Sequence, residues 1–141
     1  MSKVMVPIDG SECALRALNH VIRNAQRFQP LTLHLLNVQF PIATGTVRLF
    51  IDQATIRQYH QEEGEAMLAR ARELLSSADV PYETHIKVGR IAETIVASAK
   101  ELGCDEIVMG SRGSSSTAGH WLGSVATKTL HLASVPVTII K

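Results

Sequence analysis

The side chains best suited to bind a ligand gather in residues 109–124, which read MGSRGSSSTAGHWLGS. Glycines let the backbone approach a ligand closely, while hydroxyls and backbone amides donate hydrogen bonds to anions. Residues 113–127 carry no formal charge, so amides, hydroxyls and the start of a following helix would hold an anion there. Arg112 and Lys128 flank this stretch and can add charge-assisted hydrogen bonds. The segment therefore predicts a site for a phosphate-bearing ligand.

A flexible polar loop has a similar composition, so the neighbouring segments decide between the two interpretations. An apolar run at residues 106–110 precedes the loop, and Gly123 and Ser124 open a helical pattern after it. This strand–loop–helix setting favours the anion site. The loop is not a Walker A element, because no lysine follows its glycines at the required spacing. It also lacks the GxGxxG of dinucleotide folds and the GxSxG of a hydrolase elbow.

Alternating strands and helices must position this loop. Apolar runs predict five strands, at residues 4–8, 31–38, 82–88, 106–110 and 135–140. Apolar residues at helical spacing predict helices over residues 14–25, 67–78, 91–102 and 124–133, with Ser11 as the N-cap of the first. Strands joined by right-handed crossover helices form a parallel sheet covered on both faces, which continuous apolar runs fit. The predicted fold is a doubly wound α/β domain.

One edge of such a sheet is the expected binding site. Ligands of open α/β sheets bind beyond the carboxyl ends of the strands, near the topological switch point. The unusual segments fall at that edge: Asp9-Gly10-Ser11, Asn37-Val38 and the glycine-rich loop. Alternative roles stay open for two of the side chains, since Asp9 also fits a turn or cap residue and Arg112 a solvated side chain.

Length and composition narrow the class of protein. The chain has 141 residues, a formal net charge of +1, 45% hydrophobic and 19% charged residues, which fit a single globular domain over residues 1–141. The apolar content excludes a disordered chain, and the balanced charge disfavours nucleic acid as a partner. The longest uncharged stretch, residues 28–47, contains prolines and polar side chains, so no membrane insertion is expected.

Cysteine and histidine usage indicates a reducing compartment and no metal centre. Cys13 and Cys104 lie far apart and outside any CxxC pattern, which fits small packing residues. The six histidines show no metal-ligand spacing, although His120 lies within the glycine-rich loop. We therefore expect a cytoplasmic protein without a metal site built from its own side chains.

The spacing of the glycines points to a family. Gly110, Gly113 and Gly123, followed by Ser124, fit G-x2-G-x9-G-[S/T], which resembles the nucleotide-binding motif of the ATP-binding branch of the universal stress proteins. The segments VPIDGS at residues 6–11, IVMGSRG at 107–113 and VPVTII at 135–140 are also similar to that family, so the resemblance covers the whole chain. It implies a Rossmann-like domain whose five-stranded parallel sheet has the order 3-2-1-4-5.

The resemblance also implies a set of ligand-binding residues. Carried over position by position, the nucleotide-binding residues are Pro7, Ile8, Asp9, Val38, Met109, Gly110, Arg112, Gly113, Gly123, Ser124 and Val125. In this assignment Asp9 accepts a hydrogen bond from the nucleoside and Val38 contacts adenine. Met109 and Gly110 pack along the base and ribose, and the ribose and phosphates are surrounded by Arg112, Gly113, Gly123, Ser124 and Val125. The implied ligand is ATP, with Mg²⁺ held mainly by phosphate oxygens and water.

Three functions are compatible with the sequence. The motif favours an ATP-binding regulatory domain of the stress response, acting through an unknown protein partner or through homodimerisation by the last strand, Val137–Ile140. The alternative is a slow ATP hydrolase or an adenylating enzyme on the same fold, although the loop offers no carboxylate and no catalytic residue can be named. A nucleotide-free interaction module is the third possibility, and the complete set of glycines disfavours it.

Overall fold

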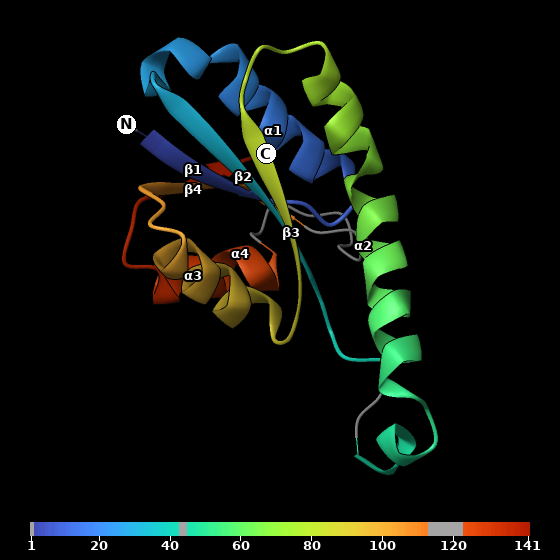
Figure 1. The fold of residues 1–141 in the computed structure, drawn as a ribbon. Coiled ribbons are helices and arrows are strands. Elements are labelled where there is room, and N and C mark those ends of the chain that lie inside the picture. Colours follow the sequence, from blue (N-terminus) through green and yellow to red (C-terminus); the bar gives the residue numbers. More distant parts are fainter. Residues whose placement is uncertain (1, 43–44, 113–122) are drawn as a thin grey trace.

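A computed structural model describes residues 2–42, 45–112 and 123–141 and shows a sheet between two layers of helices (Figure 1). The strands are β1 (Ser2–Pro7), β2 (Leu31–Gln39), β3 (Tyr82–Val88), β4 (Glu106–Gly110) and β5 (Val137–Ile140). The α-helices are α1 (Glu12–Arg23), α2 (Gln53–Ser76), α3 (Ile91–Glu101) and α4 (Ser124–Leu132). Short 3₁₀ turns span Ala25–Phe28 and Gly45–Leu49.

The sheet has the order β3-β2-β1-β4-β5, and every neighbouring pair is parallel. This confirms the predicted doubly wound fold and its strand order. The switch point lies between β1 and β4, because β2 and β3 follow on one side of β1 and β4 and β5 on the other. The last strand begins at Val137 and not at residue 135 as predicted, since Pro136 has no N–H to donate. The Pro136 carbonyl still accepts from the Ile107 N–H at 3.0 Å.

Each face of the sheet carries its own hydrophobic core. Helices α1 and α2 cover one face, and the buried residues there include Val4, Leu33, Leu18 and Leu68. Helices α3 and α4 cover the other face, and the buried residues there include Met5, Leu36, Ile95, Ile107 and Ala126. Successive strand residues alternate between the two cores, as the pleat requires. The central strands are therefore buried on both sides, which accounts for their continuous apolar sequences.

Local contacts set the positions of α1 and α2. Ser11 is the N-cap of α1, as predicted, and its Oγ accepts from the Ala14 N–H at 3.2 Å. Within α2, a Cβ atom at Gly64 would lie 2.7–2.8 Å from side-chain carbons of Ile86 in β3. Glycine at this position therefore lets α2 pack closely against the edge of the sheet.

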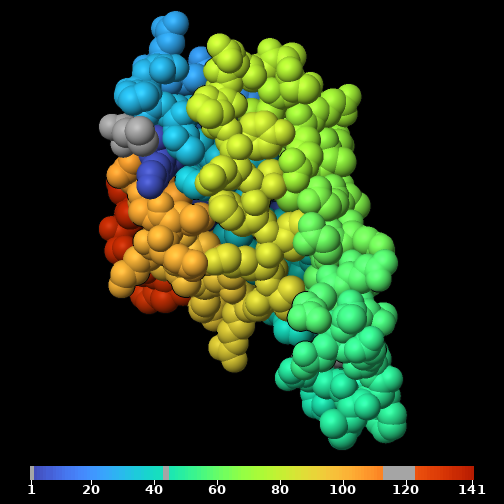
Figure 2. Space-filling model, in the orientation of Figure 1, coloured from blue at the N-terminus to red at the C-terminus, as the bar shows by residue number. Residues whose placement is uncertain are grey.

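Helix α2 extends beyond the sheet. Figure 1 and Figure 2 show its N-terminal end and the preceding 3₁₀ turn projecting from the body of the molecule. Leu49 and Phe50 of this projection are exposed. Asp52 caps the helix, because its side chain accepts from the Ala54 N–H at 3.3 Å. Within the three described ranges, no helix is both long and apolar enough to cross a membrane.

Candidate functional site

The two ends of the glycine-rich loop meet at the carboxyl end of β4. The Gly123 N–H donates to the Ser111 carbonyl at 2.6 Å, and the Ser111 N–H donates to the Ile140 carbonyl of β5 at 2.8 Å. Helix α4 starts one residue later, at Ser124, so its first-turn N–H groups begin at this point. Gly110 and Gly123 of the motif are thus brought together, whereas Gly113 lies outside the described residues.

Gly110 has a packing role as well as a place in the motif. A Cβ atom here would lie 2.9 and 3.0 Å from the carbonyl carbon and oxygen of Cys13, and 2.8 Å from its Sγ. These distances are too short for a side chain, and two of the three atoms belong to the α1 backbone. The absence of a Cβ atom therefore allows the end of β4 to lie directly against the first turn of α1.

Cys13 links α1 to the ends of β4 and β5. Its Sγ donates to the Ile140 carbonyl at 3.4 Å and lies 3.7 Å from the Ser111 hydroxyl oxygen. Burial raises the pKa of the Cys13 thiol, but hydrogen bonds from the Arg112 backbone and from Ser111 outweigh burial and lower this pKa below its ordinary value. The thiol is buried, as expected for a small packing residue. Its contact with Ser111 connects α1 to the start of the loop.

A tight turn follows β1 on the other side of the switch point. The Asp9 carboxylate accepts from the Ser11 N–H at 3.0 Å, so Asp9 does fill the turn role that the sequence left open. Gly10 has a φ of +83°, a conformation that favours glycine, and it packs against Met67 of α2. The half-buried Asp9 is therefore held at the carboxyl end of β1, next to the start of α1.

A buried polar network fixes the neighbouring strand ends. The Asn37 amide donates to the Ile8 carbonyl at 2.9 Å, and the Gln39 amide donates to the Asn37 side-chain oxygen at 2.9 Å. Gln39 also donates to the His60 carbonyl at 2.8 Å, and its own oxygen lies 2.8 Å from His60 Nδ1. All three side chains are buried. The network therefore joins the carboxyl ends of β1 and β2 to α2.

The remaining predicted residues lie around the same edge of the sheet. Pro7 is the last residue of β1, while Val38 and Met109 contribute to the core on the α3/α4 face. Val125 packs against that core, Ser124 is exposed and Arg112 is half-buried. Val38 belongs to β2, so β1 separates it from β4. Lys128, suggested as a flanking cation, pairs with Glu93 of α3 at 3.0 Å.

Loss of the Asn37 amide should destabilise the site. Asn37→Ala leaves the Ile8 carbonyl and the Gln39 amide without this partner in a buried region, and we expect a loss of about 2–3 kcal/mol in the free energy of unfolding. Asn24→Ala is the matched control, because it removes one hydrogen bond from a half-buried asparagine at the end of α1 and should cost about 1 kcal/mol. Urea denaturation measures both. Equal losses of unfolding free energy in the two variants would show that the buried network stabilises the fold no more than one hydrogen bond at a helix end.

Taken together, the fold is a doubly wound parallel sheet with both ends of a glycine-rich segment at its switch point, the place where open α/β domains bind ligands. The model of the Universal stress protein family matches residues 1–141, and the chain belongs to that family. The family assignment made from the glycine spacing is thereby confirmed.

Individual relatives match over nearly their whole length. Universal stress protein YxiE of Bacillus subtilis is 34% identical over 149 residues, covering 99% of this chain and 99% of that protein. The solved structure of MJ0577, a universal stress protein of Methanocaldococcus jannaschii, superposes with a TM-score of 0.82 at 28% identity, covering 99% of this chain and 95% of that chain. A universal stress protein crystallised in complex with cAMP superposes with a TM-score of 0.74 at 25% identity, covering 99% and 97% of the two chains.

Proposed function

We propose that this protein is an ATP-binding regulatory domain of the stress response. The observation that carries the proposal is the hydrogen bond between Gly123 and Ser111, which brings both ends of the glycine motif to the switch point of the sheet. The Asp9 turn lies across that switch point, at the end of β1. The relative in complex with cAMP supports an adenine nucleotide as the class of ligand.

Each part of the site has a role in this proposal. The Asp9 carboxylate accepts a hydrogen bond from a nucleoside hydroxyl, and Val38 and Met109 offer apolar surface to the base. Backbone amides at the start of α4 bind the phosphates, helped by the Arg112 guanidinium. The proposed nucleotide-binding residues are Pro7, Ile8, Asp9, Val38, Met109, Gly110, Arg112, Gly113, Gly123, Ser124 and Val125. Mg²⁺ would bridge phosphate oxygens and take its other ligands mainly from water.

Mass spectrometry of the small molecules released on denaturation tests the identity of the ligand. We expect the purified protein, after incubation with a mixture of nucleotides and Mg²⁺ and removal of the free pool, to release ATP. Release of only AMP or cAMP would support a nucleotide site but contradict ATP as its ligand. Continuous conversion of the added ATP to ADP would instead favour the slow hydrolase. Release of no nucleotide at all would contradict the proposal.

A homodimer is the second part of the proposal. Strand β5 lies at an edge of the sheet, and its four residues, Val137–Ile140, are each only half-buried within one chain. Half-buried apolar edge strands favour pairing with another copy. We expect light scattering at micromolar concentration to give the mass of two chains, and a monomeric mass would contradict dimerisation through β5. In cells we place the dimer in the cytoplasm, where ATP and reduced cysteines coexist.

A further inference from the structure

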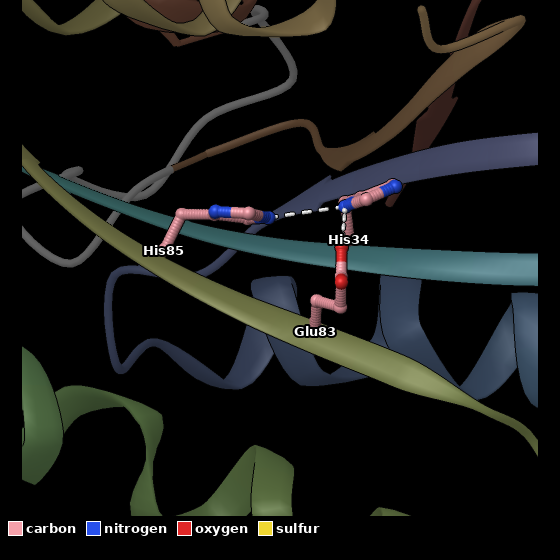
Figure 3. A group of neighbouring side chains, drawn as sticks. All are labelled: His34, Glu83 and His85. Atoms are coloured by element: carbon pink, nitrogen blue, oxygen red, sulfur yellow. Dashed lines mark hydrogen bonds and ion pairs between the residues drawn. The ribbon is translucent and has the colours of Figure 1, made fainter. Parts of the chain in front are cut away.

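Three side chains with metal-binding atoms meet across β2 and β3, on the face covered by α3 and α4. Figure 3 shows His34 of β2 beside Glu83 and His85 of β3, with the three polar groups directed toward one another. The strand register explains the meeting, because His34 pairs with Glu83 and Leu36 with His85. Residues two apart on a strand share a face, so all three side chains project to the same side of the sheet.

We propose that His34, Glu83 and His85 form a binding site for a divalent transition-metal ion of the Zn²⁺ class. His34 Nδ1 lies 3.0 Å from His85 Nε2 and 3.3 Å from Glu83 Oε2. All three donor atoms lie within 4.8 Å of one another. Donors bound tetrahedrally to one ion at about 2.0–2.2 Å are themselves about 3.3–3.6 Å apart, so small rotations of the side chains suffice to surround a metal.

The chemistry of the donors selects the class of metal. Two imidazole nitrogens and one carboxylate oxygen suit Zn²⁺, Ni²⁺ or Cu²⁺, whereas Mg²⁺ and Ca²⁺ prefer oxygen donors throughout. The Glu83 side chain is 63% exposed, which gives the ion a path from solvent and leaves room for water as a fourth ligand. The carboxylate also supplies negative charge that partly neutralises a bound dication.

His34 is the most buried of the three proposed ligands, with a side chain only 5% exposed. Its Nδ1 faces the other two donors, and its Nε2, which has no hydrogen-bond partner among the residues that the structure describes, would carry the proton when Nδ1 binds the ion.

None of the three proposed metal ligands is a proposed nucleotide-binding residue. His34 precedes Val38 by four residues on β2, a separation of about 13 Å along an extended strand, whereas His85 pairs with Leu36, two residues before Val38. The metal site therefore does not depend on the proposed function. Glu83 and His85 lie two residues apart on β3, but His34 lies 51 positions before His85, so sequence spacing could not identify the full set of ligands.

Titration of the EDTA-treated, dialysed protein with Zn²⁺ tests the proposal by calorimetry. We expect one ion to bind per chain with a micromolar Kd, and His85→Gln and Glu83→Gln each to weaken binding at least tenfold. His131→Gln is the matched control, because this exposed histidine of α4 lies outside the cluster, and it should bind as the unmodified protein does. Circular dichroism of each variant checks that the fold is retained.

Co²⁺ provides a second measurement on the same variants. Co²⁺ bound in a tetrahedral site gives visible absorption bands, which we expect for the unmodified protein and for His131→Gln but not for His85→Gln. Absence of Zn²⁺ binding at millimolar concentration would overturn the proposal. Equal binding by the site variants and the control would also overturn it, because the ion would then be held elsewhere in the chain.

Discussion

Gly123→Val is expected to weaken ATP binding at least 100-fold, a loss of about 2.7 kcal/mol of binding free energy. Gly123 is the N-cap of α4, and its N–H closes the loop by donating to the Ser111 carbonyl. A branched side chain at this position is expected to exclude phosphates sterically from the first-turn N–H groups of α4, where we propose that they bind. Its φ of −64° and ψ of 158° are accessible to valine, so the backbone can keep its conformation.

Thr127→Val is the matched control for this substitution. It places the same side chain on the exposed surface of α4, one turn after Gly123 and outside the proposed nucleotide-binding residues, and we expect its affinity for ATP to stay within twofold of the unmodified protein. Calorimetric titration and circular dichroism of both variants separate loss of binding from loss of the helix. Normal ATP binding by Gly123→Val would contradict the assignment of phosphates to the start of α4.

Gly110→Ala is expected to reduce the free energy of unfolding by about 3 kcal/mol, the upper part of the range for overpacked sites. The added methyl group would lie 2.8–3.0 Å from three atoms of Cys13, two of them in the α1 backbone. Relief therefore requires α1 to move away from β4, which disturbs the core between them. Urea denaturation followed by circular dichroism measures the loss.

Two further variants identify the cause of that loss. Cys13→Ala combined with Gly110→Ala removes the Sγ contact but leaves the backbone contacts, so we expect recovery of less than about 1 kcal/mol, since only part of the overpacking is relieved. Gly45→Ala has open space around the new methyl group and a φ of +59°, so it should cost only the penalty of a left-handed residue, about 1–2 kcal/mol. Full recovery in the double variant would show that the thiol alone causes the clash.

The fold could be predicted from the sequence because its signals are local. Apolar runs marked the buried strands, and helical spacing marked the segments between them. The ends of strands were predicted less well where a single backbone group decides whether the ladder continues. Pro136 has no N–H to donate, and the last strand is therefore shorter than predicted. The strand order came from the resemblance to the universal stress proteins, because periodicity alone does not say which strands are neighbours.

The candidate site was predicted in part. The turn at Asp9, the loop after β4 and the strand end at Asn37 follow from their positions after apolar runs. Gln39 and His60 were missed, although polar residues at alternate positions of an apolar strand were an available signal for Gln39. His60 could not be found in this way, because its contact with β2 depends on how α2 packs on the sheet.

The histidine–glutamate cluster shows a further limit of sequence reasoning. The six histidines are not spaced as metal ligands among themselves within any one segment. The register of β2 on β3 nevertheless places His34 beside Glu83 and within hydrogen-bond distance of His85. Pairing between strands distant in the sequence is a tertiary property, so the candidate metal site emerges only once the register is known.

Isothermal titration of the protein with Mg-ATP tests the central claim most directly. We expect saturable binding of one ATP per chain for the unmodified protein, and binding at least 100-fold weaker for Gly123→Val. The same titration with Asn24→Ala should match the unmodified protein, because Asn24 lies at the far end of α1 from the Asp9 turn. Absence of binding at millimolar Mg-ATP to the folded, nucleotide-free protein would contradict the proposed function.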